Sequence, residues 1–322
     1  MTYLKNNILK NIAISGITGF VGKNLEEYLI SKKETVVGVS RRTSNNNYDY
    51  TSFNKIIFDN QKAFVHLAGK AHDLKKTSED KEYFEVNTEL TKTLYNQFLK
   101  SDCEVFIYMS SVKAVADQTD GVLTENVKPN PITVYGKSKL AAEEYILSRK
   151  NLKDKRVYIL RPCMIHGPNN KGNLNLLYSF VSKGIPYPFG KYLNRRSFVS
   201  VENLCFIIKE LIDNTKIESG TYNIADDTSL STTELVQVIS ETLGISTRIL
   251  KLPKIFIRFI AKIGDFVPIL LNSERLLKLT ENFEVSNLKI KKAMQKQLPL
   301  TSSEGIKKTI SSFLDIKNNN KY

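Results

Sequence analysis

A tyrosine and a lysine stand four residues apart in the segment Tyr135-Gly136-Lys137-Ser138-Lys139. Residues at this spacing share one face of a helix, so the phenol and the ammonium are expected side by side. A neighbouring positive charge favours the phenolate and lowers the pKa of the tyrosine toward working pH. The pair could therefore pass a proton to or from a substrate hydroxyl while a hydride moves. Ser110 and Ser111 follow the preceding apolar segment, and ligands of parallel sheets bind at such strand ends.

A second chemical motif is the glycine loop Gly16-Ile17-Thr18-Gly19-Phe20-Val21-Gly22, spaced G-x-x-G-x-x-G. It follows a short β-branched run and precedes an amphipathic segment. Glycines let the backbone approach a pyrophosphate, and a helix N-terminus offers unpaired N–H groups and a positive dipole. The motif indicates a dinucleotide site, whereas a tight turn without a ligand is the plainer interpretation.

The end of the second predicted strand bears on which dinucleotide binds. NAD sites usually place an acidic residue there to hold the ribose hydroxyls. This chain instead has Ser40-Arg41-Arg42, and arginine is the natural partner of a 2′-phosphate. The sequence therefore favours NADP(H), with NAD(H) as the alternative and a solvated loop end as the interpretation without a ligand.

These motifs need a scaffold that brings strand ends together, and the first half of the chain supplies one. Short β-branched runs alternate with amphipathic stretches, which implies a doubly wound parallel sheet. The expected strands are 11–15, 35–40, 63–67, 104–109 and 156–160, and the expected helices are 20–31, 83–100 and 134–149. One further strand falls at 48–50 or at 55–58. After Pro162 the pattern turns irregular, with short helices expected at 174–182, 201–213 and 232–243.

Composition limits the remaining function classes. The net charge is +14, and from residue 245 onward 15 basic residues face 6 acidic ones. Compositional bias, an anionic ligand or an acidic membrane surface would each explain this charge, and no nucleic-acid module is recognisable, so no nucleic-acid partner is expected. Three scattered cysteines and three scattered histidines predict neither disulfides nor a metal site, so the metal prediction is none. No signal peptide or membrane span is recognised, and a reducing cytoplasm is the expected location.

The segment Ile255–Leu271 is apolar but interrupted by Arg258, Lys262 and Asp265. It is too broken to span a bilayer. A helix packed against the second domain is the favoured interpretation. The alternative is an amphipathic helix at a membrane interface, which would give the chain a peripheral membrane association.

Taken together, the motifs resemble the extended short-chain dehydrogenase/reductases that modify nucleotide sugars, the NAD-dependent epimerase/dehydratase family. The resemblance covers residues 11 to about 315 and is carried by GITGFVG (16–22), HLAG (66–69), Asn87, SSVKAV (110–115), YGKSK (135–139), RPCMIHGP (161–168) and RRSFVSVENL (195–204). It implies a Rossmann-like α/β fold with a smaller C-terminal α/β substrate domain. The implied division is 1–168 with 197–225 for the cofactor, 169–196 with 226–316 for the substrate, and a disordered tail at 317–322.

The resemblance also assigns roles. Ser111 would hydrogen-bond the reacting oxygen, Tyr135 would be the acid/base, and Lys139 would also bind the nicotinamide ribose. The implied cofactor contacts are Gly16, Thr18, Gly19, Phe20, Val21, Gly22, Ser40, Arg41, Arg42, Leu67, Ala68, Gly69, Asn87, Tyr135, Lys139 and Pro162. The implied substrate contacts are Lys113, Met164, Asn173, Arg196 and Arg275. His66 is expected to be a packed histidine that supports the backbone.

Departures from the family pattern at Lys113, Ala116 and Met164 argue against a simple glucose/galactose epimerase. The favoured function is NADPH-dependent reduction of a UDP-4-keto-6-deoxy-N-acetylhexosamine in surface-polysaccharide synthesis. The alternative is a UDP-glucose or UDP-N-acetylglucosamine 4-epimerase with tightly bound NAD. A non-catalytic relative that binds nucleotides or RNA is the distant third. A homodimer formed through the Tyr135 helix and the helix before it is expected by resemblance.

Overall fold

The computed structural model describes residues 10–40, 47–49, 58, 60–70, 79–149, 154–170, 173–267 and 271–319. Its centre is a seven-stranded sheet with the order β10-β7-β5-β4-β1-β2-β3, and all the pairings between its strands are parallel. The strands are β1 (Asn11–Ser15), β2 (Val36–Ser40), β3 (Asn47–Asp49), β4 (Gln61–His66), β5 (Val105–Met109), β7 (Arg156–Pro162) and β10 (Gly220–Ile224). The chain runs outward from β1 to β3, then returns to add β4 on the other side of β1. The carboxyl ends of β1 and β4 therefore mark the switch point where such sheets bind ligands.

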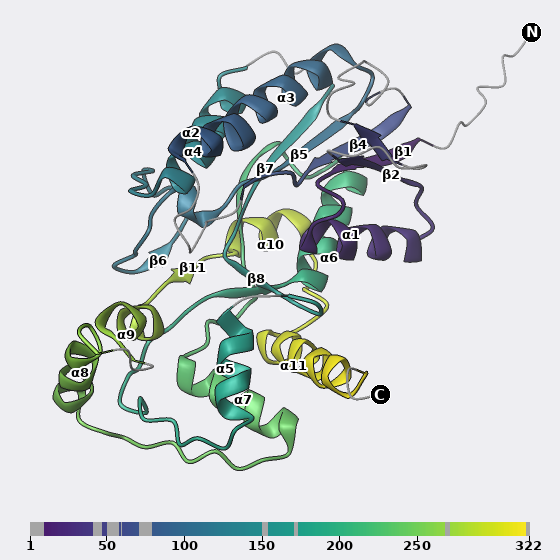
Figure 1. The fold of residues 1–322 in the computed structure, drawn as a ribbon. Coiled ribbons are helices and arrows are strands. Elements are labelled where there is room, and N and C mark those ends of the chain that lie inside the picture. The colour runs from purple at the N-terminus through teal and green to yellow at the C-terminus, as the bar shows by residue number, and fades with distance from the viewer. Residues whose placement is uncertain are drawn as a thin grey trace, which may run out of the picture.

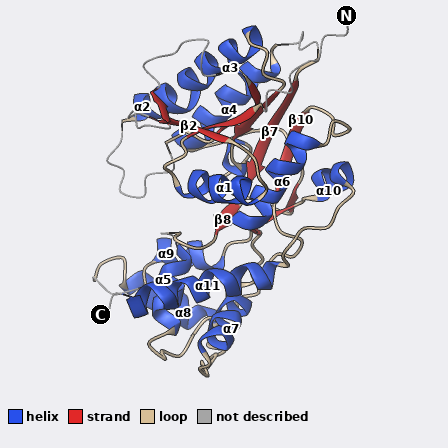
Figure 2. Cartoon of the chain, turned by 90° about the vertical axis from the view of Figure 1, so that its right-hand side faces the viewer, coloured by secondary structure: helices blue, strands red, loops and turns tan. Residues whose placement is uncertain are grey.

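Helices cover both faces of this sheet (Figures 1 and 2). One face carries α1 (Phe20–Ser31) and α6 (Val201–Asp213), which pack against each other. The other face carries α2 (Asp80–Phe84), a π-helical turn (Glu85–Glu89), α3 (Leu90–Lys100) and α4 (Val134–Leu147). The strands between them are almost wholly buried, because a parallel sheet covered on both faces has no solvent side.

The remaining helices gather below the carboxyl ends of the strands in Figure 1. They are α5 (Asn173–Val181), α7 (Thr232–Leu243), α8 (Lys254–Ile263), α9 (Ser273–Thr280) and α11 (Ser302–Asn319), with α10 (Leu288–Met294) against β10. Two small parallel pairs, β8 (Met164–His166) with β9 (Phe198–Ser200) and β6 (Val122–Leu123) with β11 (Glu284–Val285), complete the described elements. Helices α5, α7, α8, α9 and α11 share a second hydrophobic cluster, the lower hydrophobic cluster, which includes Tyr178, Val236, Ile257, Ile306 and Phe313.

The doubly wound α/β fold expected from the sequence is confirmed. The bounds predicted for β1, α1, α6 and α7 agree with the structure, and β3 overlaps the first of the two segments considered for that strand. The single helix predicted over 83–100 is wrong in detail, since a π-helical turn separates α2 from α3. α11 runs to Asn319, and the rest of the tail predicted over 317–322 lies outside the described residues.

None of the described helices combines the length and the apolar character needed to cross a membrane.

Candidate active site

The glycine loop lies at the switch point of the sheet, as its position after β1 requires. Gly16 has a φ of 73°, which L side chains avoid, and its amide donates to the carbonyl of Val39 at 3.0 Å. A Cβ on Gly16 would lie 2.8 Å from the amide nitrogen of Ala68, and one on Gly22 would lie 2.4 Å from the carbonyl oxygen of Gly16. These two glycines therefore allow the loop to pack against the segment after β4 and against its own helix.

Gly19 is different, because it leaves space open. A Cβ there would meet only the carbonyl oxygen of Gly16, at 3.2 Å. Gly19 is also the N-cap of α1, and no side chain caps this helix. Thr18 beside it is exposed, while Phe20 and Val21 pack partly onto the hydrophobic cluster under α1. Exposed backbone at a helix N-terminus fits a pyrophosphate.

Asn87 ties the loop after β4 to α4. It is fully buried in the π-helical turn, accepts from the amide of Lys70 at 2.8 Å and donates to the carbonyl of Lys70 at 3.1 Å. Its amide also donates to Ser138 Oγ on α4 at 3.0 Å. A Cβ on Gly69 would lie 2.9 Å from both Asn87 Oδ1 and Lys139 Nζ, so these polar atoms lie directly against this glycine. The structure thus brings 67–69, Asn87 and Lys139 together at one strand edge.

The start of α4 is fixed by two polar side chains. Asp117 accepts from the amides of Ile132 and Thr133 at 2.7 and 3.1 Å. Thr133 is the N-cap and accepts from the amide of Gly136 at 3.2 Å. A capped first turn has few backbone conformations. Tyr135, the second residue of α4, therefore projects from a rigid position.

Ser111 and Tyr135 meet beyond the end of β5. Ser111 is buried, begins a short 3-10 turn and accepts from the amide of Lys113 at 3.2 Å. Burial raises the pKa of Tyr135, and a hydrogen bond with Ser111 opposes this rise. The sequence predicted a lowered tyrosine pKa, and this prediction is wrong for the protein alone, since desolvation of the phenolate outweighs the favourable contacts.

Lys139 lies one turn further along α4 and is almost wholly buried. Its Nζ donates to the carbonyl of Met109 at 2.9 Å and lies 5.0 Å from the centre of the Tyr108 ring. Burial lowers the pKa of Lys139 to about 8, although the nearby Glu143 carboxylate opposes this change. Lys139 is therefore a buried cation whose charge is lost at mildly alkaline pH.

A buried ion pair that was not predicted from the sequence lies beneath this site. Glu143 follows Lys139 by four residues on α4, and its carboxylate accepts from Arg161 Nε at 3.0 and 3.1 Å. Ser110 Oγ donates to the same carboxylate. Both charged side chains are almost wholly buried, and the pair joins α4 to β7 under the strand end that carries Ser111. The available signal was an arginine directly after the apolar run of β7.

Two cations predicted as substrate contacts both adjoin Phe283. Lys113 Nζ lies 4.6 Å from the centre of the Phe283 ring and donates to the carbonyl of Asp117 at 2.7 Å. Arg196 bridges to Phe283 through the backbone and pairs with Glu281 at 3.5 Å. Burial lowers the pKa of both side chains. Two partly desolvated cations so close together favour an anionic ligand.

The other predicted substrate contacts are more dispersed. Met164 in β8 is half-buried and packs on the lower hydrophobic cluster. Asn173 is the first residue of α5, and Arg275 is exposed on α9.

Of the other residues predicted to contact the cofactor, the structure describes three and leaves out two arginines. Ser40 ends β2 and is buried, Leu67 packs partly on the hydrophobic cluster under α1, and Pro162 ends β7 beside Ile224. Arg41 and Arg42, on which the NADP(H) prediction depends, lie outside the described residues.

His66 is a packed histidine, as expected. Its Nδ1 lies 2.6 Å from Ser15 Oγ and its Nε2 lies 2.9 Å from Thr91 Oγ1. Burial lowers the pKa of His66 to about 3, and the Lys139 charge adds to this effect. A neutral imidazole therefore joins β1, β4 and α3 beneath the loop after β4.

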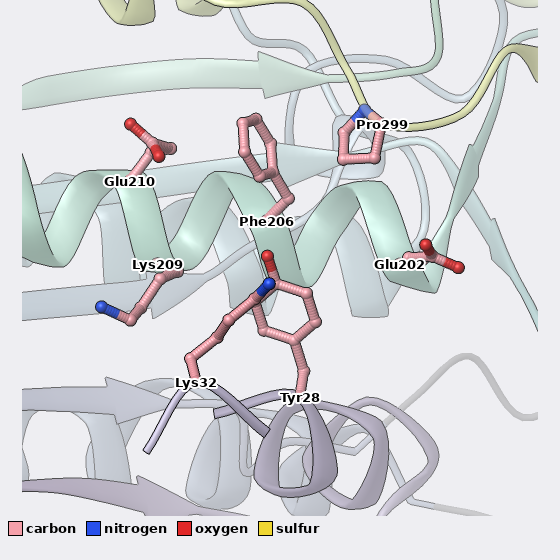
Figure 3. A pocket seen from close by; sticks show the side chains of 7 residues that line it. All are labelled: Tyr28, Lys32, Glu202, Phe206, Lys209, Glu210 and Pro299. Atoms are coloured by element: carbon pink, nitrogen blue, oxygen red, sulfur yellow. The ribbon is translucent and has the colours of Figure 1, made fainter. Parts of the chain in front are cut away.

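A groove of about 520 Å³ lies between α1 and α6, on the face of the sheet opposite α4 (Figure 3). Figure 3 shows the Tyr28 ring directed toward Phe206, and Lys32 Nζ lies 5.4 Å from the centre of the Tyr28 ring. Lys209, which also lines the groove, pairs with Glu34 at 2.8 Å. Its lining includes none of the residues grouped around Tyr135.

Comparison with known proteins agrees with this geometry. The sequence pattern of the NAD dependent epimerase/dehydratase family matches residues 12–225. A UDP-glucose 4-epimerase of Vibrio cholerae is 32% identical over 332 residues, which covers 96% of this chain and 97% of that protein. A second relative is the N-acetyl-alpha-D-glucosaminyl-diphospho-ditrans,octacis-undecaprenol 4-epimerase of Escherichia coli O157:H7. It is 26% identical over 295 residues, which covers 88% of this chain and 85% of that protein.

Among solved structures, the Bordetella bronchiseptica enzyme WbmG in complex with NAD has the same fold. The two structures match with a TM-score of 0.74 at 14% identity, over 97% of this chain and 96% of that one. The family pattern spans well over half of the chain and includes the glycine loop, Ser111, Tyr135 and Lys139. The chain therefore belongs to the NAD dependent epimerase/dehydratase family, whose enzymes act with a nicotinamide dinucleotide.

Proposed function

We propose that this protein inverts the configuration at C4 of a UDP-sugar by transient oxidation and reduction. The observation that carries the proposal is the contact of Ser111 with Tyr135 beside the buried Lys139, at a strand end next to the glycine loop. The names of the Vibrio cholerae and Escherichia coli relatives support a 4-epimerase.

In this proposal a bound nicotinamide dinucleotide would supply reversible hydride transfer at C4, so that the carbon is oxidised and then reduced from the opposite face. Tyr135 takes the proton from the C4 hydroxyl and gives it back when the carbonyl is reduced. Ser111 hydrogen-bonds the same oxygen and fixes its distance from the phenol. Lys139 supplies positive charge that favours the phenolate and a donor for the nicotinamide ribose.

The dinucleotide would lie along the switch point. The open backbone at Gly19 and the first turn of α1 would hold the pyrophosphate. Ser40 would lie near the adenosine ribose, while 67–69 and Pro162 would line the path to the nicotinamide. Asn87 would hold the loop after β4 in place, because it bonds both backbone groups of Lys70.

For the substrate, Lys113 and Arg196 would bind the diphosphate, since they are partly buried cations that contact Phe283 through its ring and its backbone. Met164, Asn173 and Arg275 would complete the sugar and uridine contacts. In keeping with this, we propose that 1–168 with 197–225 bind the cofactor and that 169–196 with 226–316 bind the substrate. A cytoplasmic homodimer that acts in polysaccharide synthesis completes the proposal.

A second candidate is NADPH-dependent reduction of a UDP-4-keto-6-deoxy-N-acetylhexosamine. It is favoured by Ser40-Arg41-Arg42, which lacks the acidic residue that NAD sites usually have, and by Ala116 and Met164. The same three catalytic residues serve either reaction, so the cofactor decides between them. A reductase consumes exchangeable NADPH, whereas an epimerase recovers its own NAD in each cycle.

One pair of assays separates the two. For an epimerase, mass spectrometry of the purified protein finds NAD, and UDP-glucose or UDP-N-acetylglucosamine is converted to its C4 partner without added cofactor. For a reductase, the UDP-4-keto-sugar consumes one NADPH per molecule and the fully hydroxylated sugars do not react.

The catalytic assignment is tested by Tyr135→Phe, which removes one hydroxyl and should lower turnover by roughly 10²–10⁴-fold in whichever assay is active. Tyr145→Phe, a phenol on the far end of the same helix, is the matched control and should retain the parent rate. Equal rates for the two variants would overturn the assignment of Tyr135.

A further inference from the structure

An exposed apolar surface with a basic edge lies on the outside of the lower helical group. It is formed by α8 and the residues that follow it, and Figure 1 shows α8 at the margin of that group, next to α9. The exposed fractions are 82% for Ile255, 52% for Phe256, 62% for Phe259, 43% for Ile263, 92% for Phe266 and 48% for Val267. Three phenylalanines in one such surface are unusual for a face that meets only water.

The helix separates its residues into rows. Ile257 and Ala261 form one row, are 1% exposed each and belong to the lower hydrophobic cluster. Ile255, Phe259 and Ile263 follow at the same spacing of four, about 180° around the helix from the buried row. α8 is therefore held by one edge while its opposite edge is apolar and exposed. The two sequence interpretations, a packed helix and an interfacial helix, each describe one of these edges.

The basic residues form the row between these two edges. Lys254, Arg258 and Lys262 recur every four residues, are all exposed, and α8 itself contains no acidic residue. Lys254 Nζ lies 5.3 Å from the centre of the Tyr192 ring, so the row begins where α8 meets the loop that carries this tyrosine. An apolar line bordered by a line of cations is the pattern of helices that lie in the interface of an anionic bilayer.

We propose that the α8 surface, defined as Lys254–Ile263 with Phe266 and Val267, docks this protein on an anionic phospholipid surface. The phenylalanines and isoleucines enter the boundary between headgroups and acyl chains, and the three cations lie level with the phosphates. A second copy of this chain would bring the like-charged rows together, so charge complementarity favours lipid as the occupant.

The position of the surface has a consequence for orientation. α8 packs on α9, and α9 leads directly into Glu281, the partner of Arg196. A bilayer bound by α8 would therefore meet the molecule on the side of the proposed diphosphate contacts. The docking proposal itself does not depend on the reaction, because its test contains no substrate.

The test is co-sedimentation of the full chain with phosphatidylcholine vesicles, with and without phosphatidylglycerol. We expect binding to the anionic vesicles that weakens as salt rises. The triple variant Phe256→Ser, Phe259→Ser, Phe266→Ser should lose at least tenfold in partition coefficient. The double variant Arg258→Gln, Lys262→Gln should lose roughly 25-fold at low salt, at about fivefold per charge, and lose most of its salt dependence.

The matched control is Ile30→Ser, Leu176→Ser, which removes two exposed apolar side chains, 57% and 72% exposed, away from α8. This control should bind vesicles like the parent. Thermal unfolding should be unchanged in all variants, since the substituted side chains are exposed. Absence of parent binding to anionic vesicles would overturn the proposal, and so would equal loss in the control. A change of oligomeric state in the triple variant without lipid, together with no vesicle binding by the parent, would assign the surface to a second copy instead.

Discussion

Replacing Lys139 by methionine should separate the stability of this protein from its activity. The side chain keeps its length and loses its charge, while the fully buried ammonium of the parent has a pKa of about 8 against 10.5 for an exposed lysine. From these two values, burial of Lys139 destabilises the folded state by about 3 kcal/mol at pH 7, where the buried lysine is charged, and by about 1 kcal/mol at pH 9.5, where it has lost its proton. The buried cation is therefore a local source of instability that shrinks as pH rises.

The direction in which stability changes with pH follows from proton binding in the folded and unfolded states. Between pH 8 and 10.5 the unfolded chain holds a proton on this lysine that the folded protein has released, so this group makes the parent more stable as pH rises through that window. Lys139→Met has no such group. The stability of the variant relative to the parent should therefore fall by about 2 kcal/mol between pH 7 and pH 9.5.

Urea unfolding of both proteins at the two pH values measures this difference, and other titrating groups cancel in the comparison. Lys137→Met, an exposed lysine on the same helix, is the control and should show no such pH dependence. Turnover of Lys139→Met should be lost at both pH values. A stability difference that stays constant with pH would refute the conclusion that Lys139 is charged and desolvated at pH 7.

Three further predictions concern the surroundings of the site. Glu143→Gln should move the alkaline limb of kcat/KM to lower pH, because the carboxylate raises the pKa of Lys139, and a pH–rate profile checks this. Gly22→Ala should lower the free energy of unfolding in urea by at least about 2 kcal/mol, because its Cβ would meet backbone atoms. Gly19→Ala should keep that stability and weaken dinucleotide binding, as measured by fluorescence titration. His66→Asn should reduce the loss of stability between pH 6.5 and 3, and acid unfolding measures this. In that range the parent histidine is protonated in the unfolded chain and stays neutral in the folded protein.

Much of the scaffold could be predicted from the sequence because its signals are local. β1 and α1 are separated by a glycine turn, and α7 begins with a Ser231–Glu234 capping box that any reader of the sequence can find. The order of chemistry-bearing loops then follows from the parallel sheet, which places Gly16, Ala68 and Ser111 at the same edge. Local propensity and global topology agree at these positions.

The π-helical turn could not be predicted in the same way. The apolar spacing of 83–100 is compatible with one continuous helix, and the extra residue in the turn has no local signature. What selects it is tertiary: Asn87 must reach both backbone groups of Lys70 and the hydroxyl of Ser138 at once. π-Helical turns often occur at functional sites, and this one is built around a side chain that holds the loop after β4.

The pKa values of the acid/base residues could not be predicted from the sequence either. Tyr135, Lys139 and Glu143 form one row on α4 at a spacing of four, and the first two alone suggested a lowered tyrosine pKa. The structure adds the burial of the row, which raises the pKa of Tyr135 and lowers that of Lys139. It also adds Arg161, which pairs with Glu143 from β7 and holds that carboxylate in place. Glu143 is paired with Arg161, whereas burial lowers the pKa of Lys139 to about 8, so deprotonation of Lys139 should set the alkaline limit of activity.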